Sequence, residues 1–354
     1  MNTIIAEAGS NHNGNKENAK KLIELAHAAG ASSIKFQFIF PEGLYLPYTQ
    51  VDGKIEKSVV FHIREKEQLT QAAWEEVWLH AKTVGIPISA SVFCSRGVSL
   101  LKHLGAEYVK IASTDLTNIS LINLVCQNFN DVIISTGMAT IEEVANTVAW
   151  VKQNYPNVNL KLMHCVSVYP CDFKQSQLNR ISALSKAFDL DVGYSDHTSD
   201  ATSAAMAWSM GVRIFEKHFT HDKSAAGFDH AHAQDAEELR RYVDTLNSCN
   251  QAVTWQPYEI DAAQKITKVR ARRGFYAARD LPKGHILTEG DILSVRPSSC
   301  SGVNDASQLI GRRLESAVQK YSAFGQAIYL RQEQASWKEA QSFWSDEMKQ
   351  KKME

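Results

Sequence analysis

Short apolar runs alternate with amphipathic stretches along most of the chain. The runs are nearly continuous and rich in strand-forming residues, which is typical of parallel strands buried on both faces. They cover Ile4–Ala8, Ser33–Gln37, Ile86–Ser91, Tyr108–Ile111, Asp131–Ser135, Leu160–Cys165, Asp189–Tyr194 and Arg213–Lys217. Apolar positions at helical spacing between them predict helices that include Asn18–Ala29, Leu69–Val84, Val98–Leu104, Ile141–Asn154 and Ala201–Met210. Eight strand–helix units in about 240 residues predict an α/β fold, a (β/α)8 TIM barrel, rather than an open doubly wound sheet.

The regions outside this repeat suggest the domain organisation. The stretch Phe38–Gln68 has the mixed charged, glycine and proline content of an exposed active-site loop inserted after the second strand. We assign residues 1–250 to the barrel, 251–268 to a linker, and 269–332 to a second domain with short strands and frequent turns. Roughly sixty residues form a weak independent core, so the second domain should lean on the barrel or on another subunit. The tail, residues 333–354, carries three aromatic side chains and predicts either a docked helix or a partner-binding motif.

Composition and charge argue against several classes of function. The chain has 354 residues with 38 Lys and Arg against 39 Asp and Glu, a formal net charge of −1, so no positive field favours nucleic acid or a membrane surface. No apolar run approaches the ~20 residues needed to span a bilayer, and the N-terminus lacks the features of a signal peptide. Six scattered cysteines without a C-x-x-C pair suggest reduced thiols. We therefore expect a cytoplasmic enzyme with neither nucleic-acid nor membrane partners.

Almost every predicted strand ends in polar side chains, and in a TIM barrel the carboxyl ends of the strands carry the chemistry. Lysines in the second and fourth strands, Lys35 and Lys110, stand among several strand-end serines. This combination favours an anionic substrate with a phosphate or carboxylate group. The alternative is that both lysines neutralise Glu7, Asp115 and Glu216 in structural ion pairs, and both interpretations can be partly true.

His197 and His218 come from adjacent predicted strands, so their imidazoles could meet over one metal ion. Two histidines with few carboxylates leave positions for water and substrate, unlike a closed structural zinc site. Asp196 and Glu216 flank the pair and are candidates for orienting it. The competing interpretation is that each histidine is a hydrogen-bonded structural residue.

A second group of histidines, His221, His230 and His232, offers a competing metal site. Its small neighbours and loop-like sequence favour solvent-exposed histidines near the barrel mouth instead. A basic cluster at residues 265–273 is interpreted as a solvated face of the linker. The sequence contains no nucleotide-binding glycine motif in the required strand–helix context, no G-x-S-x-G and no H-E-x-x-H.

Seven ordered motifs accompany these strand ends: IIAEAGSNHNG at 4–14, IKFQ at 34–37, YVKIAS at 108–113, ISTGM at 134–138, HC…YP at 164–170, GYSDHT at 193–198 and FEKHFT at 215–220. In this order they resemble the N-acetylneuraminate (sialic acid) synthase family. The stretch Gly274–Tyr329 resembles the antifreeze-like (SAF) domain that ends these enzymes. The resemblance covers nearly the whole chain up to about residue 332.

The resemblance implies a TIM barrel followed by a small antifreeze-like β-clip domain. It implies a domain-swapped homodimer in which that domain covers the partner's barrel mouth. The implied reaction condenses phosphoenolpyruvate with an N-acyl amino-hexose, N-acetylmannosamine or similar, to a nine-carbon 2-keto sugar acid and phosphate. The implied cofactor is a divalent metal ion, usually Mn²⁺, with Mg²⁺ or Co²⁺ as alternatives.

The family's functional residues map onto this sequence by position. Its phosphoenolpyruvate contacts fall on Lys35, Ser91, Lys110, Ser113, Ser135 and Ser167. Its metal ligands fall on His197 and His218, and its sugar contacts on Gln37, Tyr169, Asp229 and, from the antifreeze-like domain, Arg296. The catalytic carboxylates implied are Glu7, which could position or deprotonate a water, and Asp229, which could assist at the sugar oxygens.

Some positions depart from the family pattern. Ser91 stands where threonine is common, Ser167 where asparagine may stand, and Phe228 where a Gly-Pro-Asp loop has proline. Legionaminic and pseudaminic acid synthases of the same family are therefore alternatives. Octulosonate- and heptulosonate-type synthases lack the antifreeze-like domain, and a non-enzymatic carbohydrate-binding protein would not need the charged strand ends.

Overall fold

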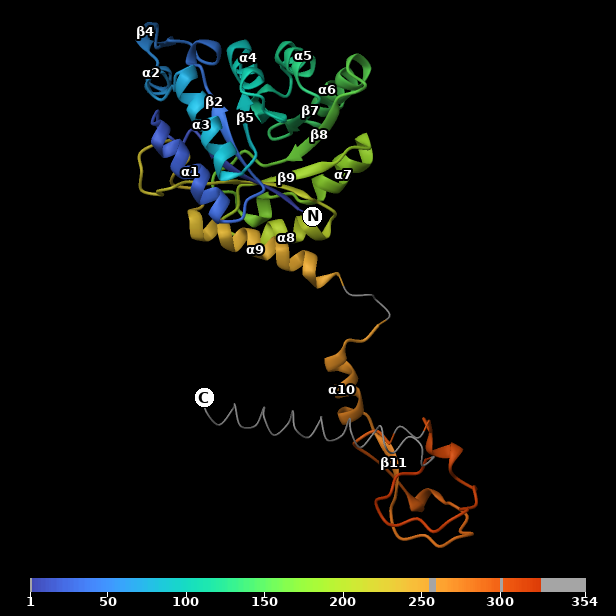
Figure 1. Ribbon diagram of the computed structural model, residues 1–354. Helices are drawn as coiled ribbons and strands as arrows, with labels where there is room; N and C mark the ends of the chain where they lie inside the picture. The colour runs from blue at the N-terminus through green and yellow to red at the C-terminus, as the bar shows by residue number, and fades with distance from the viewer. Residues whose placement is uncertain (1, 255–258, 300–301, 326–354) are drawn as a thin grey trace. The chain divides into compact units, whose positions relative to one another are not determined.

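The computed structural model describes residues 2–254, 259–299 and 302–325, and this chain divides into two compact units, residues 1–254 and residues 255 onwards. The first unit is a closed barrel of parallel strands in the order β1-β10-β9-β8-β7-β6-β5-β2, surrounded by helices (Figure 1). The predicted TIM barrel is therefore confirmed.

The barrel strands are β1 Thr3–Gly9, β2 Ser33–Phe38, β5 Ile88–Val92, β6 Tyr108–Ile111, β7 Asp131–Ser135, β8 Asn159–His164, β9 Val192–Asp196 and β10 Ile214–His218. The helices around them are α1 Lys16–Ala28, α3 Gln71–Val84, α4 Ser95–His103, α5 Ile119–Asn128, α6 Ile141–Asn154, α7 Asn179–Phe188, α8 Thr202–Ser209 and α9 Ala236–Ala252. Each barrel strand coincides with one of the predicted apolar runs. The largest difference is at β9, which was predicted to begin at Asp189, where the backbone instead forms the left-handed cap of α7.

Local sequence signals set the helix ends. Thr140 accepts a hydrogen bond from the Glu143 amide while the Glu143 carboxylate accepts one from the Thr140 amide, a capping box that begins α6. Asp235 and Glu238 form the same capping box at α9. Gly85 ends α3 with φ of 86°, a left-handed conformation that favours glycine.

Alternate residues of each strand face opposite layers of the barrel. Outward-facing residues such as Ile34, Phe36 and Phe38 join the main core beneath the helices. Inward-facing Ile5, Ile133 and Met163 form a small separate apolar cluster inside the barrel. The polar side chains at the strand ends lie beyond this cluster, which closes the barrel interior beneath them with apolar groups.

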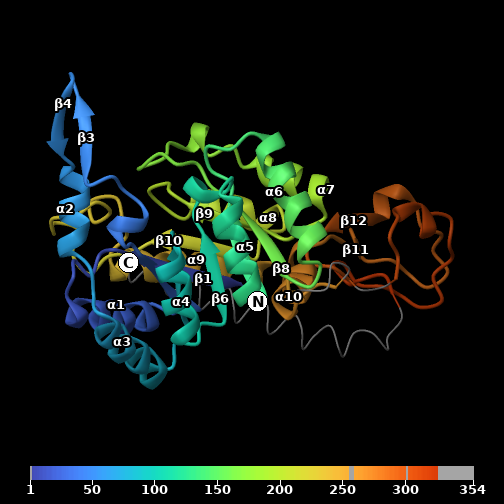
Figure 2. The same cartoon turned by 90° about the horizontal axis from the view of Figure 1, so that it is seen from above.

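The insertion after β2 is not the loop that the sequence predicted. It contains a short 3-10 turn, Pro41–Gly43, an antiparallel hairpin of β3 Tyr48–Val51 and β4 Lys54–Lys57, and helix α2 Val59–Lys66. The hairpin stands out from the barrel (Figure 2). The prediction failed because a hairpin with exposed faces on both sides carries no hydrophobic alternation.

The second unit is small and rich in turns. Helix α10, Ala262–Ala271, precedes an antiparallel pair of strands, β11 Gly274–Ala277 and β12 Ile292–Val295. The buried side chains of its core are Ala277, Leu281, Leu287, Leu309 and Phe324. The buried carboxylate of Asp291 accepts hydrogen bonds from His285, Thr288 and Arg279, and these bonds hold its pKa below the usual range.

Part of the expected linker is helical, because α10 begins at Ala262 and carries Lys265, Lys268 and Arg270 of the basic cluster. The tail 333–354 lies outside the described residues, as do residues 255–258 of the linker. The five cysteines in the described ranges are free thiols. No helix in the described part of the chain is long and apolar enough to cross a bilayer.

Candidate active site

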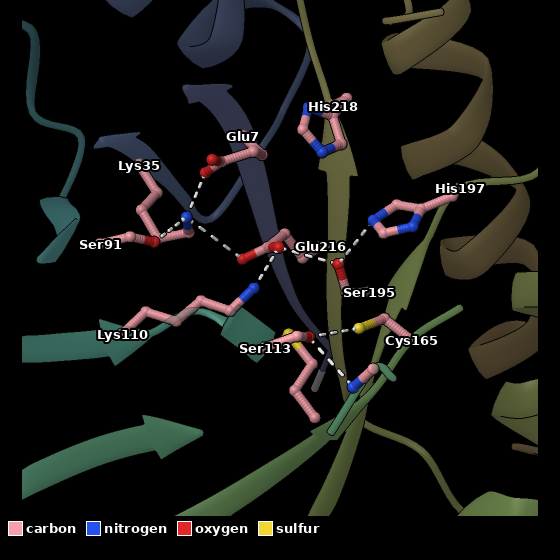
Figure 3. Close-up of polar contacts among 12 residues, drawn as sticks. Glu7, Lys35, Ser91, Lys110, Ser113, Cys165, Ser195, His197, Glu216 and His218 are labelled. Atoms are coloured by element: carbon pink, nitrogen blue, oxygen red, sulfur yellow. Dashed lines mark hydrogen bonds and ion pairs between the residues drawn. The ribbon is translucent and has the colours of Figure 1, made fainter. Parts of the chain in front are cut away.

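Four charged side chains from four barrel strands meet at the carboxyl end of the barrel (Figure 3). Lys35 of β2 lies between two carboxylates, in an ion pair with Glu7 of β1 and 3.6 Å from Glu216 of β10. Lys110 of β6 forms a second ion pair with Glu216. All four residues are at most 5% exposed. The interpretation of the lysines as ion-pair partners therefore holds for Glu7 and Glu216.

The two carboxyl groups of this cluster have opposite pKa shifts. Burial raises the pKa of Glu7 to about 7, against the smaller opposing effect of Lys35. Burial also acts on Glu216, but Lys110 and Lys35 together outweigh it and hold the pKa of Glu216 below its usual range. Protonation of Glu7 near neutral pH leaves two ammonium groups facing one carboxylate. In that state the cluster carries one net positive charge, which favours the binding of an anion.

Hydroxyl and thiol groups gather beside the lysines around Gly137. A Cβ atom built on Gly137 would lie 2.5 Å from Ser167 Oγ and 2.8 Å from Ser113 Oγ, so only glycine fits there. The Gly137 amide donates a hydrogen bond of 3.0 Å to Ser113 Oγ. Among the described residues, the buried Ser135 hydroxyl has no hydrogen-bond partner. Such a group of donors beside two ammonium groups is suited to binding phosphate or carboxylate oxygens.

A cluster of aromatic and imidazole rings lines the opposite side of the cavity. The ring of Tyr169 lies 4.2 Å from that of His197 and 4.9 Å from that of His232, and the rings of His197 and His218 are 5.4 Å apart. Burial, followed by the neighbouring imidazole, lowers the pKa of both His197 and His218 to about 3. Both are therefore neutral at physiological pH, which is the form that binds metal ions.

The prediction that the later histidines are solvent-exposed is wrong. His230 is fully buried, with a 2.7 Å hydrogen bond between its Nδ1 and Thr220 Oγ1. The His232 ring lies 5.2 Å from that of His218. His218 Nδ1 and His232 Nε2 are 3.8 and 3.9 Å from the carboxylate of Asp229, and the potential ligand atoms of the three residues lie within 4.8 Å of one another. This donor set fits a divalent metal ion.

The insertion after β2 contributes to the same cavity. Leu44 and Tyr45, just after its first turn, line the wall. Arg64 of α2 donates a hydrogen bond of 2.6 Å to Ser10 Oγ, and its guanidinium stacks on the ring of Phe228 at 4.1 Å. The insertion therefore fixes the residue that precedes Asp229. Sequence reasoning missed this contact because nothing in the spacing of the two segments pairs them.

One cavity of about 480 Å³ brings together the barrel residues that were predicted for the site. They are Glu7, Lys35, Gln37, Ser91, Lys110, Ser113, Ser135, Ser167, Tyr169, His197, His218 and Asp229. Arg296 follows β12 in the second unit and is exposed.

Three polar residues near strand ends do not face this cavity. Asp196, predicted to orient the histidines, lies 3.3 Å from Lys217 on the side of the barrel that faces the helices. His164 contacts the Ser176 carbonyl oxygen there at 2.8 Å. Asp115, considered as a partner of the lysines, accepts hydrogen bonds from Thr114 and Asn118 instead. Strand alternation explains the first two cases, because neighbours of inward-facing residues must face outward.

The fold and this site can now be compared with known proteins. The model of the NeuB family matches residues 22–256, and that of the SAF domain matches residues 272–320. The chain belongs to the NeuB family and carries a SAF domain after its barrel.

Several similar proteins are named as synthases of related sugar acids. An N,N'-diacetyllegionaminic acid synthase from Campylobacter jejuni is 33% identical over 84% of this chain and 90% of its own length. A pseudaminic acid synthase from the same species is 30% identical over 92% of this chain and 94% of its own. The crystal structure of an N-acetylneuraminic acid synthetase from Leptospira borgpetersenii aligns with a TM-score of 0.66 and 28% identity, over 75% of this chain and 89% of that one.

Proposed function

We propose that this protein condenses phosphoenolpyruvate with an N-acyl amino-hexose to give a nine-carbon 2-keto sugar acid and phosphate. The observation that carries the proposal is the single cavity in which Lys35, Lys110 and the hydroxyl groups around Gly137 face His197 and His218. A small substrate that carries both a phosphate and a carboxylate needs several ammonium groups and hydrogen-bond donors close together, as they are in this cavity. The neutral imidazoles opposite supply a place for a metal ion beside the second substrate.

In this proposal, C3 of phosphoenolpyruvate forms the new bond to the aldehyde carbon of the sugar. Lys35 and Lys110 hold the phosphate and the carboxylate, and Ser113 and Ser135 add hydrogen bonds. The attack leaves positive character at C2 and an alkoxide at the former aldehyde oxygen, which takes up a proton to become a hydroxyl. A water adds at C2, and the C2–O bond to phosphate then breaks while the new C2 hydroxyl gives up its proton to the departing phosphate and becomes the keto group. Glu7, with a pKa of about 7, takes the proton of that water, because a base works best when its pKa lies near the working pH.

His197 and His218 would hold the divalent ion, Mn²⁺ or a similar ion. When bound, this ion would act as a Lewis acid on the aldehyde oxygen. The His197 Nδ1 atom lies 2.6 Å from the Val166 carbonyl oxygen, which fixes the orientation of the ring. Fixing the ring in this way leaves Nε2 directed toward the cavity side of β9, where it lies 3.3 Å from Ser195 Oγ.

Two kinds of acceptor are candidates. N-Acetylmannosamine would give N-acetylneuraminate. The relatives named as N,N'-diacetyllegionaminic acid synthases favour an acceptor with two acetamido groups, because phosphoenolpyruvate brings no nitrogen to the product. Phe228, which departs from the family pattern, precedes Asp229, and Tyr45 of the insertion lines the same cavity. This side of the cavity is where the second group would be accommodated.

Incubation of the protein with phosphoenolpyruvate, Mn²⁺ and a panel of N-acyl hexoses tests the proposal. We expect phosphate release only when a suitable acceptor is present. The product should have the mass of the acceptor plus that of pyruvic acid. Excess chelator should abolish turnover, and added Mn²⁺ should restore it. Absence of phosphate release with every acceptor would contradict the synthase function. Full turnover in chelator would contradict the metal requirement alone.

We further propose that the SAF domain acts in trans, in a swapped homodimer where Arg296 completes the partner's sugar site. Among the described residues its core has five buried apolar side chains, which supports a domain that needs a larger surface to pack on. An Arg296→Ala chain mixed with a Glu7→Gln chain, under conditions that exchange subunits, should recover one working site per heterodimer, although each homodimer is nearly inactive. Mixing that restores nothing would show that the domain serves its own barrel or none.

A further inference from the structure

Arg64, a buried arginine of α2, joins three segments beside the cavity. Its guanidinium donates a hydrogen bond of 2.6 Å to Ser10 Oγ, directly after β1, and one of 2.9 Å to Glu67, directly after α2. The same group lies 4.1 Å from the centre of the Phe228 ring, in the loop between β10 and α9. Arg64 is only 7% exposed, and a cation over an aromatic ring is held more strongly where water is excluded. The insertion after β2 is therefore fastened to two loops of the barrel through one side chain.

The loop that carries Phe228 also carries Asp229, which lines the cavity. Asn13 Nδ2 donates a hydrogen bond of 3.0 Å to the Ala226 carbonyl oxygen, and Asn13 Oδ1 lies 3.2 Å from Nε2 of the buried His230. These contacts hold the loop on both sides of Asp229. The Phe228 ring under the guanidinium adds an anchor at the adjacent residue, so the backbone of Asp229 is fixed by its neighbours.

The Asp229 carboxylate also packs closely against the loop after β1. A Cβ atom built on Gly9 would lie 3.0 Å from Asp229 Oδ2, so the backbone of this glycine lies close to the carboxylate. Arg64 holds the next residue, Ser10, by its hydrogen bond. Arg64 therefore fixes the surroundings of Asp229 in two ways, through Phe228 and through Ser10.

We propose that Arg64 is a positioning residue for the sugar acceptor, because it holds Asp229 in place on the acceptor side of the cavity. The inference rests on the proposed function for the identity of the acceptor, whereas the fixing of the loop is independent of any activity. The two lysines that would bind phosphoenolpyruvate are held by their own ion pairs within the barrel. Loss of the Arg64 guanidinium therefore weakens the use of the acceptor and leaves the binding of phosphoenolpyruvate intact.

Steady-state kinetics of Arg64→Met, with each substrate varied in turn, test this inference. Methionine keeps much of the apolar stem but removes the charge and the donors. We expect the KM for the acceptor to rise about tenfold and the KM for phosphoenolpyruvate to stay within about twofold of the wild type. Phe228→Leu should also raise the KM for the acceptor, and in the double variant it should add little to Arg64→Met. Arg96→Met is the matched control and should behave as the wild type, because Arg96 lies 4.1 Å from the centre of the Phe40 ring but lines a separate pocket.

Hydrogen exchange of the full-length protein without substrates measures the loop itself, and thermal unfolding shows whether each variant is folded. Peptides that cover residues 226–234 should exchange faster in Arg64→Met and Phe228→Leu than in the wild type and in Arg96→Met. Phe228→Leu keeps the hydrogen bonds of Arg64, so it tests the contact even where Arg64→Met fails to fold.

Three kinetic results would overturn the inference: equal changes in both KM values, an unchanged KM for the acceptor in Arg64→Met, or full addition of the two effects in the double variant. If exchange changes as expected but the wild type turns over no acceptor, the positioning role of Arg64 stands and the proposed function fails. If exchange in the loop is also unchanged, both fail.

Discussion

A Glu7→Gln variant is expected to remain folded and to lose about 10²–10⁴-fold in kcat, the usual contribution of a positioned general base. Glu7 contacts Gln37 and Lys35 in the cavity, and its pKa is raised to about 7, mainly by burial. A base must be deprotonated to act, so the wild-type rate should rise with pH through about 7 and level off above it. Glutamine cannot take a proton, so this ascending limb should be missing from the variant.

The measurement is the pH profile of kcat/KM for both proteins. The phosphate of phosphoenolpyruvate ionises in the same way for both, so the ratio of the two profiles isolates Glu7. If kcat/KM of Glu7→Gln still rose with pH through about 7, a group other than Glu7 would be responsible for the rise. A falling limb that disappears in the variant would make Glu7 an acid rather than a base.

A Lys110→Met variant should lower both the stability of the protein and its use of phosphoenolpyruvate, and the two effects can be separated. The substitution leaves the buried carboxylate of Glu216 without its closer partner, a change that typically costs about 3–5 kcal/mol of unfolding free energy. It also removes a charge that would face the substrate, which costs about 1.5–3 kcal/mol, or roughly one to two decades in kcat/KM.

The double variant Lys110→Met/Glu216→Gln should recover most of the lost stability, because the unpaired charge is gone, but not the kcat/KM for phosphoenolpyruvate. Glu216→Gln alone keeps both ammonium groups and should not raise the KM for phosphoenolpyruvate. Lys217→Met is the matched control, since Lys217 forms a buried pair with Asp196 that faces the helices. It should destabilise the fold and leave the KM unchanged. Normal phosphoenolpyruvate use by the double variant would mean that Lys110 serves only the fold.

The sequence by itself determined the barrel and its strand ends. Continuous apolar runs are typical of strands covered on both faces. Strand alternation points Glu7, Lys35 and Lys110 into the barrel, and the parallel strand direction brings their strand ends to one side of it. Inward-facing positions at that end gathered most of the predicted side chains in one cavity. The family resemblance, confirmed by the matches to the NeuB family and the SAF domain, came from the same strand-end motifs.

Only the tertiary structure decided which groups are partners across the barrel. The sequence offered Glu7, Asp115 and Glu216 as possible partners of the lysines, and only the strand order showed that Glu216 lies between Lys35 and Lys110 whereas Asp115 pairs with neither. The same holds for His232, which local sequence assigned to an exposed loop. Its partly buried ring packs against the rings of Tyr169, which follows β8, and His218, which ends β10, and the closed barrel brings these residues together. Periodicity reports which face of an element is buried, whereas the partner on that face depends on the packing of the whole chain.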